Sequence, residues 1–227
     1  MPSATSSSII RSILAVGAVV IAGCSFGTKC PSGMVSVGQL EGQFCIHQYE
    51  ASLTGELGNL DQGQSYPDGS TAVTIISQAG LTPTKTSWYQ AYAACELAGF
   101  HLCTSAEWED ACDDTVGPGG MEYPTPDGTY DVSLCPIGDF RAQKQADLGL
   151  SGASPNCHTR SGVHDMLGNL WEWTNPVSVD GSGLPQIDKR GGGHYGAEPV
   201  SCDRSAVGTH SPSFEGTIGF RCCSGPV

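Results

Sequence analysis

The sequence predicts one α+β domain that is rich in loops and stapled by disulfides. Of its 227 residues, 31 are glycine, 14 are proline and 11 are cysteine, while 15% are charged. This composition is typical of a loop-rich globular protein and unlike that of a coiled coil or a helical bundle. Two amphipathic helical patterns stand among short segments of alternating polarity, with neither an internal repeat nor a second apolar core. A single domain with little regular structure is therefore expected.

Charge and cysteine content limit the partners and the compartment. The formal net charge is −13, which repels phosphate backbones, so nucleic acid is not expected as a partner. Eleven cysteines would be left unpaired in a reducing cytosol, and an oxidising compartment is therefore predicted.

Residues 1–23 have the pattern of a bacterial lipoprotein signal peptide. Arg11 precedes an almost wholly apolar run at 13–22, and about ten apolar residues are too few to span a bilayer comfortably. The run ends in Ile-Ala-Gly-Cys, which resembles a lipobox and predicts cleavage before Cys24, with a lipid on the Cys24 thiol. Residues 24–29 are then the lipidated cysteine and a short tether.

Lipidation of Cys24 leaves ten cysteines, enough for five disulfides without a remaining thiol. The lipid would anchor the protein to a membrane of the bacterial cell envelope, and Ser25 after the lipidated cysteine favours the outer membrane over the inner. The alternative is an ordinary signal peptide cut near Ala22 or Gly23, with Cys24 paired elsewhere.

The domain itself, residues 30–227, is expected to begin with a β-hairpin. Residues 30–37 and 44–50 alternate apolar and polar side chains around a glycine-containing turn, which brings Cys30 and Cys45 close enough for a bridge. Residues 52–70 are polar, glycine-rich and without periodicity, and they predict a surface insertion.

Two helices are predicted next. Ser87 can cap the first, within 86–99, and Gly99 suits its end. Thr104 and Glu107 form a capping box at the start of the second. The side chains expected on the buried faces are Trp88, Ala91, Tyr92 and Cys95 in the first helix, and Trp108, Ala111 and Cys112 in the second.

Beyond the helices the chain predicts mainly turns. Residues 117–153 are punctuated by proline and glycine, and they predict loops. Residues 165–174 and 189–193 predict short ordered segments, and residues 218–223 predict a final strand.

Several blocks of this chain resemble the formylglycine-generating enzymes, the sulfatase-modifying factor family. The longest are the two helical segments, 86–99 and 102–112, and the block Asp-Met-Leu-Gly-Asn-Leu-Trp-Glu-Trp-Thr at 165–174. The shorter blocks are Gly33-Met-Val with Tyr49-Glu50, Arg190-Gly-Gly, and Ile218-Gly-Phe-Arg-Cys. They follow the family order across nearly the whole domain. The resemblance implies the family fold, a variant of the C-type lectin-like fold.

The resemblance also implies a disulfide map. The family's bridges carry over as Cys95–Cys222 and Cys112–Cys202. Pairing of neighbours then gives Cys103–Cys223, Cys30–Cys45 and Cys135–Cys157. Cys222 and Cys223 would point to opposite faces of one strand and could therefore serve different partners.

The family's chemistry, in contrast, is not matched. Formylglycine generation is expected to need two cysteines beyond the Arg-Gly-Gly segment, whose thiolates hold copper. Those positions fall on Gly196 and Ser201 here, Cys202 is assigned to a bridge, and Gly193 replaces the serine that usually follows the segment. No copper is expected, no catalytic residue is assigned, and an enzyme is not favoured.

The block at 165–174 resembles a structural calcium site of the family. The implied ligands are the side chains of Asp165 and Glu172 and the main-chain carbonyls of Gly168 and Leu170. Such oxygen ligands are those that calcium prefers, and Asn169 is expected to fix the turn. The alternative is an ordinary hydrogen-bonded turn with Trp171 and Trp173 in the core.

Other polar residues show weaker patterns. His194, Tyr195 and Glu198 lie where the family has its active groove, and they are predicted to line a ligand groove. Arg204 and Arg221 are expected to tie loop carboxylates, or else to clamp a ligand. The histidines show no paired spacing, and surface or hydrogen-bonded positions are expected for His47, His101, His158, His164, His194 and His210.

Together these patterns predict a lipid-anchored envelope protein whose domain is a non-catalytic binding or scaffold module. Its ligand would be an unidentified protein or glycan. The alternative is a metal-dependent oxidoreductase of the same superfamily with altered chemistry, built on a histidine.

Overall fold

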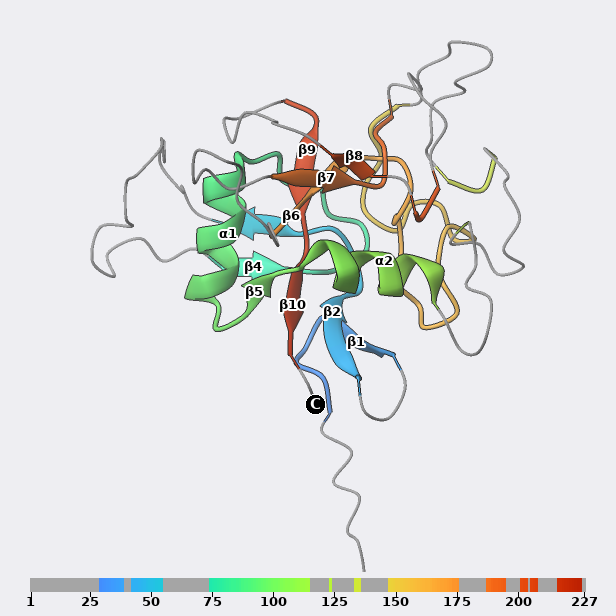
Figure 1. Cartoon of the computed structure of the whole chain (residues 1–227). Helices are drawn as coiled ribbons and strands as arrows, with labels where there is room; N and C mark the ends of the chain where they lie inside the picture. The colour runs from blue at the N-terminus through green and yellow to red at the C-terminus, as the bar shows by residue number, and fades with distance from the viewer. Residues whose placement is uncertain are drawn as a thin grey trace, which may run out of the picture.

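The part of the chain that the structure describes contains two helices and three small β-sheets (Figure 1). The structure is a computed structural model, and it describes residues 29–38, 42–54, 74–114, 123, 133–135, 147–175, 187–194, 201–203, 205–207 and 216–225. The elements are β1 (Met34–Val37), β2 (Phe44–His47), β3 (Ser52–Thr54), β4 (Thr74–Ile76), α1 (Trp88–Leu97), β5 (His101–Leu102), α2 (Ser105–Asp113), β6 (Trp171–Thr174), β7 (Asp188–Arg190), β8 (Ser205–Val207), β9 (Ile218–Phe220) and β10 (Cys222–Ser224). Neither of the helices in these ranges has the length and apolar character to cross a membrane.

The two larger sheets meet at the end of the chain. One has the strand order β1-β2-β10-β5, and its pairs are antiparallel. The other has the order β8-β7-β6-β9, in which β6 and β9 run parallel. Because β9 and β10 belong to different sheets, the prediction of one strand at 218–223 is wrong. The chain changes sheet at Arg221.

The predicted insertion at 52–70 is also wrong at its beginning. Ser52–Thr54 pair antiparallel with Thr74–Ile76 as the small sheet β3-β4. Ala51 accepts a hydrogen bond from Thr84 N at 2.9 Å and donates to the Phe220 carbonyl at 3.0 Å, which joins this sheet to the core. Residues 55–70 lie outside the described residues.

Both helices begin where the capping residues predict. Ser87 Oγ accepts from the Gln90 backbone N–H, and the Gln90 side chain accepts in return from the Ser87 backbone at 2.9 Å. Thr104 and Glu107 form the same reciprocal box at α2. Beyond α1, Gly99 has a φ of +79°, in the left-handed region that glycine adopts readily.

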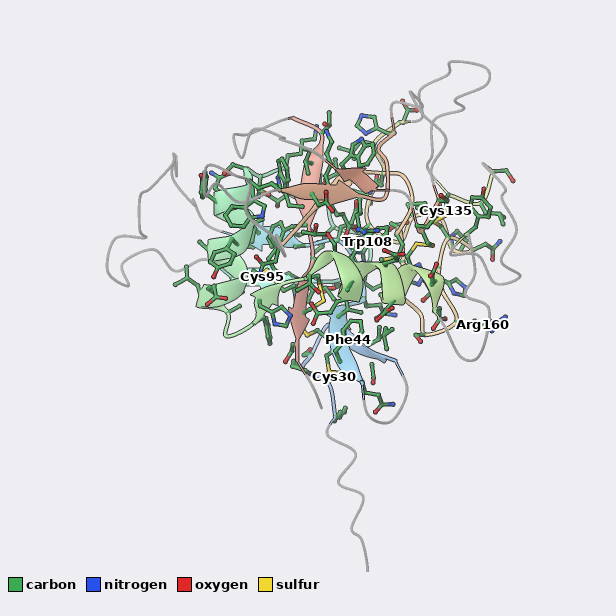
Figure 2. The ribbon with its side chains drawn as sticks, in the orientation of Figure 1. Cys30, Phe44, Cys95, Trp108, Cys135 and Arg160 are labelled. Atoms are coloured by element: carbon green, nitrogen blue, oxygen red, sulfur yellow. A yellow bond between two sulfur atoms is a disulfide. The ribbon has the colours of Figure 1, made fainter. Side chains whose placement is uncertain are left out.

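All five expected disulfides are present: Cys30–Cys45, Cys95–Cys222, Cys103–Cys223, Cys112–Cys202 and Cys135–Cys157. The adjacent β10 cysteines belong to two separate core clusters, one containing Trp108 and the other Trp173, as their opposite directions predict. Figure 2 shows Cys30, Cys95 and Cys135 in three separate regions of the molecule, so the bridges connect segments in different parts of the described fold.

Candidate functional site

Arg221 lies where the two larger sheets meet, and it is 0% exposed. Its Nε donates to both carboxylate oxygens of Glu172, at 2.8 and 2.9 Å. Its Nη1 donates to the carbonyls of His47 and Gln48, both at 3.2 Å, and its Nη2 donates to the carbonyl of His164. Arg221 therefore ties a carboxylate, as expected, although Glu172 lies in strand β6 rather than in a loop. Arg204 lies outside the described residues.

A second buried acid, Glu50, binds the turn between residues 165 and 170. Glu50 accepts hydrogen bonds from Asn169 Nδ2 at 2.6 Å, from Leu170 N at 3.1 Å and from Ser151 Oγ at 3.4 Å. Asn169 has a φ of +55°, and its Oδ1 accepts from Gly149 N at 2.8 Å. Asn169 thus fixes the turn, as predicted.

Three buried carboxyls share the single guanidinium of Arg221. Burial, and then the charges of Glu172 and Asp165, hold the pKa of Glu50 well above its ordinary value. Burial likewise raises the pKa of Glu172 and that of Asp165, although Arg221 acts in the opposite direction on both. The cluster therefore has more acidic groups than one cation can compensate.

The calcium ligands predicted in this cluster are only partly open to an ion. Asp165 Oδ2 accepts from Gly152 N, whereas Asp165 Oδ1 is buried without a hydrogen-bond partner and could serve as a ligand. Both Glu172 oxygens are bonded to Arg221, and one also accepts from Trp108 Nε1 at 2.8 Å. The part of the chain that the structure describes holds no group of three or more acidic, histidine or cysteine side chains arranged for a metal. Calcium at this turn stays a prediction.

The segment after β7 packs closely against the 165–174 block. A Cβ on Gly191 would come within 2.7 Å of the Met166 carbonyl oxygen, at a φ of +88° that favours glycine. A Cβ on Gly193 would approach Trp171 Cδ1 to 3.0 Å. Glycine at position 193, where the family usually has serine, therefore lets the Trp171 indole lie directly against the backbone.

His194 is the only predicted groove residue that the structure describes. It is 9% exposed, its backbone N–H donates to the Asn169 carbonyl at 3.2 Å, and its Nδ1 lies 2.8 Å from the same oxygen. These bonds hold the imidazole against the turn that Glu50 also binds. Tyr195 and Glu198 lie outside the described residues, so the groove stays a prediction.

Of the two positions that match the family's copper ligands, the structure describes Ser201. Its Oγ donates to Asp203 Oδ1, and its neighbour Cys202 is bonded to Cys112. Gly196 lies outside the described residues. Since the ten cysteines that follow Cys24 form the five bridges, none of them offers a thiolate to copper.

The structure also pairs two histidines that the sequence analysis treated as scattered. His158 and His164 are partners in an isolated antiparallel bridge, and their ring centroids are 5.2 Å apart. The sequence signal for this pairing is the Ser161-Gly162 dipeptide between the two histidines, because Ser-Gly favours a turn. In the structure the turn is closed by a hydrogen bond of 3.0 Å from Gly162 N–H to the Thr159 carbonyl. Gly162, which has a φ of +85° there, could have been used to predict the turn.

The chain resembles formylglycine-generating enzymes of known sequence. It is 30% identical to the formylglycine-generating enzyme of Mycobacterium tuberculosis over 184 residues, which cover 67% of this chain and 60% of that protein. It is 32% identical to the inactive C-alpha-formylglycine-generating enzyme 2 of Mus musculus over 163 residues, covering 66% of this chain and 51% of that protein. The chain thus spans between 51% and 60% of the length of these two relatives.

A solved structure shares the fold, and a family model shows the family. The structure of CarF covers 82% of this chain, and 87% of that chain is covered in turn, with a TM-score of 0.54 and 18% sequence identity, a likeness of fold alone. The model of the sulfatase-modifying factor enzyme 1-like domain matches residues 35–225. Five disulfides, the Arg221–Glu172 pair and this match agree with the α+β fold that the resemblance implied, and the chain belongs to the sulfatase-modifying factor enzyme 1-like domain family.

Proposed function

We propose that this chain is a non-catalytic, lipid-anchored module that binds a protein or glycan at the bacterial cell envelope. One observation carries the non-catalytic part: the cysteines from Cys30 to Cys223 are all in disulfides. Thiolates are the ligands that suit Cu(I), and a hydroxyl such as that of Ser201 is a poor substitute. A two-cysteine copper centre therefore has no ligands in this domain.

A relative without activity supports this proposal. The Mus musculus protein, at 32% identity, is named inactive C-alpha-formylglycine-generating enzyme 2. Fold and function can separate in this way because activity depends on a few side chains of the site.

The arrangement of the strands suits a binding module that is anchored at one side of the molecule. Cys30 lies beside β1 and β2, at the end of the molecule opposite β7 and β8 (Figures 1 and 2). Five residues separate Cys24 from Cys30, a reach of about 20 Å when extended. An anchor on Cys24 would hold the β1–β2 end close to the membrane and leave the segment after β7 facing away from it.

Metal analysis and oxygen consumption test the non-catalytic part. The purified protein, with its disulfides intact, is expected to contain no stoichiometric iron and no thiolate-bound copper, and to consume no oxygen with thiol substrates. The formylglycine-generating enzyme of Mycobacterium tuberculosis serves as the positive control. Stoichiometric copper or iron together with turnover would instead support the oxidoreductase with altered chemistry.

A Cys24→Ser variant tests the anchor. The wild-type protein is expected in the membrane fraction, with diacylglycerol on Cys24 detected by mass spectrometry of the N-terminal peptide. The variant is expected to leave that fraction without a loss of thermal stability, because Cys24 is outside the five bridges. Equal membrane retention of both proteins would overturn the anchor.

A further inference from the structure

His158 and His164 face each other across a short two-stranded ribbon. Thr159 N donates to the Val163 carbonyl at 2.9 Å, and Asp165 N donates to the Cys157 carbonyl at 3.1 Å. These two bonds flank the histidines, which therefore form a non-hydrogen-bonded pair, the arrangement in which facing side chains come closest. Their rings are 5.2 Å apart between centroids and tilted by 41°.

The ribbon is held in place on both sides. The His158 strand begins at Cys157, which is bonded to Cys135. His164 N donates to the Gln48 carbonyl at 2.8 Å, and the His164 carbonyl accepts from Arg221. The Tyr49 ring stacks on His164 at 4.8 Å. The two imidazoles are thus positioned before any ligand arrives.

The nitrogen atoms of the pair are suited to accept a metal ion. His158 Nδ1 lies 2.8 Å from the Thr159 carbonyl oxygen, so this nitrogen carries the proton and Nε2 carries the lone pair. His164 Nδ1 is buried without a partner.

We propose that His158 and His164 together bind one divalent transition-metal ion of the Zn²⁺, Ni²⁺ or Cu²⁺ type, with water completing its coordination. Imidazole suits these ions. At metal–nitrogen distances of about 2.0–2.1 Å, two imidazoles on one tetrahedral ion have centroids about 5 Å apart, which agrees with the observed 5.2 Å. The site differs in chemistry from the predicted calcium turn, because calcium prefers oxygen ligands.

The affinity of this site for a metal ion is expected to come from the imidazole nitrogens rather than from neighbouring negative charge. Arg221 donates a hydrogen bond to the His164 carbonyl, and Arg160 lies in the exposed turn between the histidines, at the edge of the molecule in Figure 2. Asp165, the nearest acid along the chain, directs one oxygen to Gly152 N. Hard cations such as Mg²⁺ are therefore not expected to compete.

Titration of the tag-free, full-length protein with Zn²⁺ in excess calcium tests the proposal. We expect one Zn²⁺ per chain, and at least about tenfold weaker binding in His158→Gln and in His164→Gln. Zn²⁺ should raise the melting temperature of the wild type but not that of His158→Gln. The electron paramagnetic resonance signal of bound Cu²⁺ should show two imidazole nitrogens in the wild type and at most one in either variant.

His101→Gln is the matched control, because His101 is a half-buried histidine bonded to Glu107 at 2.9 Å, away from the pair. It should bind Zn²⁺ as the wild type does. His164→Gln loses the Tyr49 contact and is the variant more prone to unfold. The His158 ring is hydrogen-bonded to its chain neighbour Thr159 and contacts His164 itself, so His158→Gln keeps the test valid. Unchanged Zn²⁺ affinity in His158→Gln, or an equal loss in His101→Gln, would overturn the proposal.

Discussion

Arg221 and Arg190 are both buried arginines in blocks that match the family, but their surroundings differ. Arg221 uses all three guanidinium nitrogens and faces the fully buried Glu172. Arg190 Nη1 contacts the Cys202 carbonyl at 3.3 Å and the more exposed Glu109 at 3.0 Å. Arg190 Nε has no partner within the ranges that the structure describes.

This difference separates the centre that holds the fold from the segment where the family's chemistry would be. Around Arg221, the matching residues are those that join the sheets and fix the 165–170 turn. Around Arg190, Gly193 and Ser201 replace residues that the resemblance leads one to expect. The family's residues that join the sheets are therefore present around Arg221, whereas Gly196 and Ser201 stand at the positions that the resemblance assigns to the two copper-binding cysteines.

The largest effect is expected from Arg221→Met, which would leave Glu172 buried without its cation. Breaking a buried pair on one side costs about 3–5 kcal/mol, enough to unfold many domains of this size. Arg190→Met is the matched control, and it should cost about 1 kcal/mol because its partner Glu109 is more exposed. Urea unfolding with intact disulfides measures both, and equal losses would contradict the distinction between the two arginines.

A double Cys112→Ala, Cys202→Ala variant should lower the local stability of the region around Arg190 more than that of the region around Arg221. Loss of a native disulfide costs about 2–5 kcal/mol, chiefly through the entropy of the unfolded chain. Since Cys202 is the neighbour of Arg190 rather than of Arg221, hydrogen exchange should rise in residues 187–203 and less in residues 165–174. A uniform increase over both segments would mean that they unfold as one unit.

Local chemistry explains which parts of the fold could be predicted. Capping at Ser87 and Thr104 depends on residues three positions apart, so the sequence contains the whole signal. Two disulfides, Cys95–Cys222 and Cys112–Cys202, followed from the family resemblance, and the other three from pairing of the remaining neighbours. The change of sheet at Arg221 could not be predicted. It depends on strands that are far away in the sequence and on a buried partner, Glu172, in another strand.

The candidate site was harder to predict for the same reason. Glu172 was expected to face calcium, yet its oxygens are bonded to Arg221 and Trp108, two residues far away in sequence. The pairing of His158 with His164 depends on ribbon register, which hydrogen bonds of the backbone set. Residue types identify the candidate donors, but only the fold decides which of them meet.

Calcium offers a test of whether the 165–170 turn is also a metal site. If calcium binds there, a concentration about one hundred times its dissociation constant should add about 2.7 kcal/mol to the free energy of unfolding. Asp165→Asn should remove most of this gain, since it lacks the carboxylate charge but suits the φ of +56° at this position. No stabilisation over EDTA in the wild type would favour the ordinary hydrogen-bonded turn.

The smallest effect is expected from Gly193→Ser, which restores the family's usual residue in the segment after β7. Its Cβ would lie 3.0 Å from Trp171 Cδ1, so the indole must shift, and such overpacking costs about 1–3 kcal/mol. The lower end is expected because Trp171 is only half-buried. Near-ultraviolet circular dichroism and urea unfolding measure the shift and its cost, with Gly149→Ser as the control, since its Cβ would meet no atom closer than 3.8 Å. An unchanged Trp171 environment would mean that position 193 accepts serine without strain. The contact with Trp171 would then not explain why this chain has glycine where the family usually has serine.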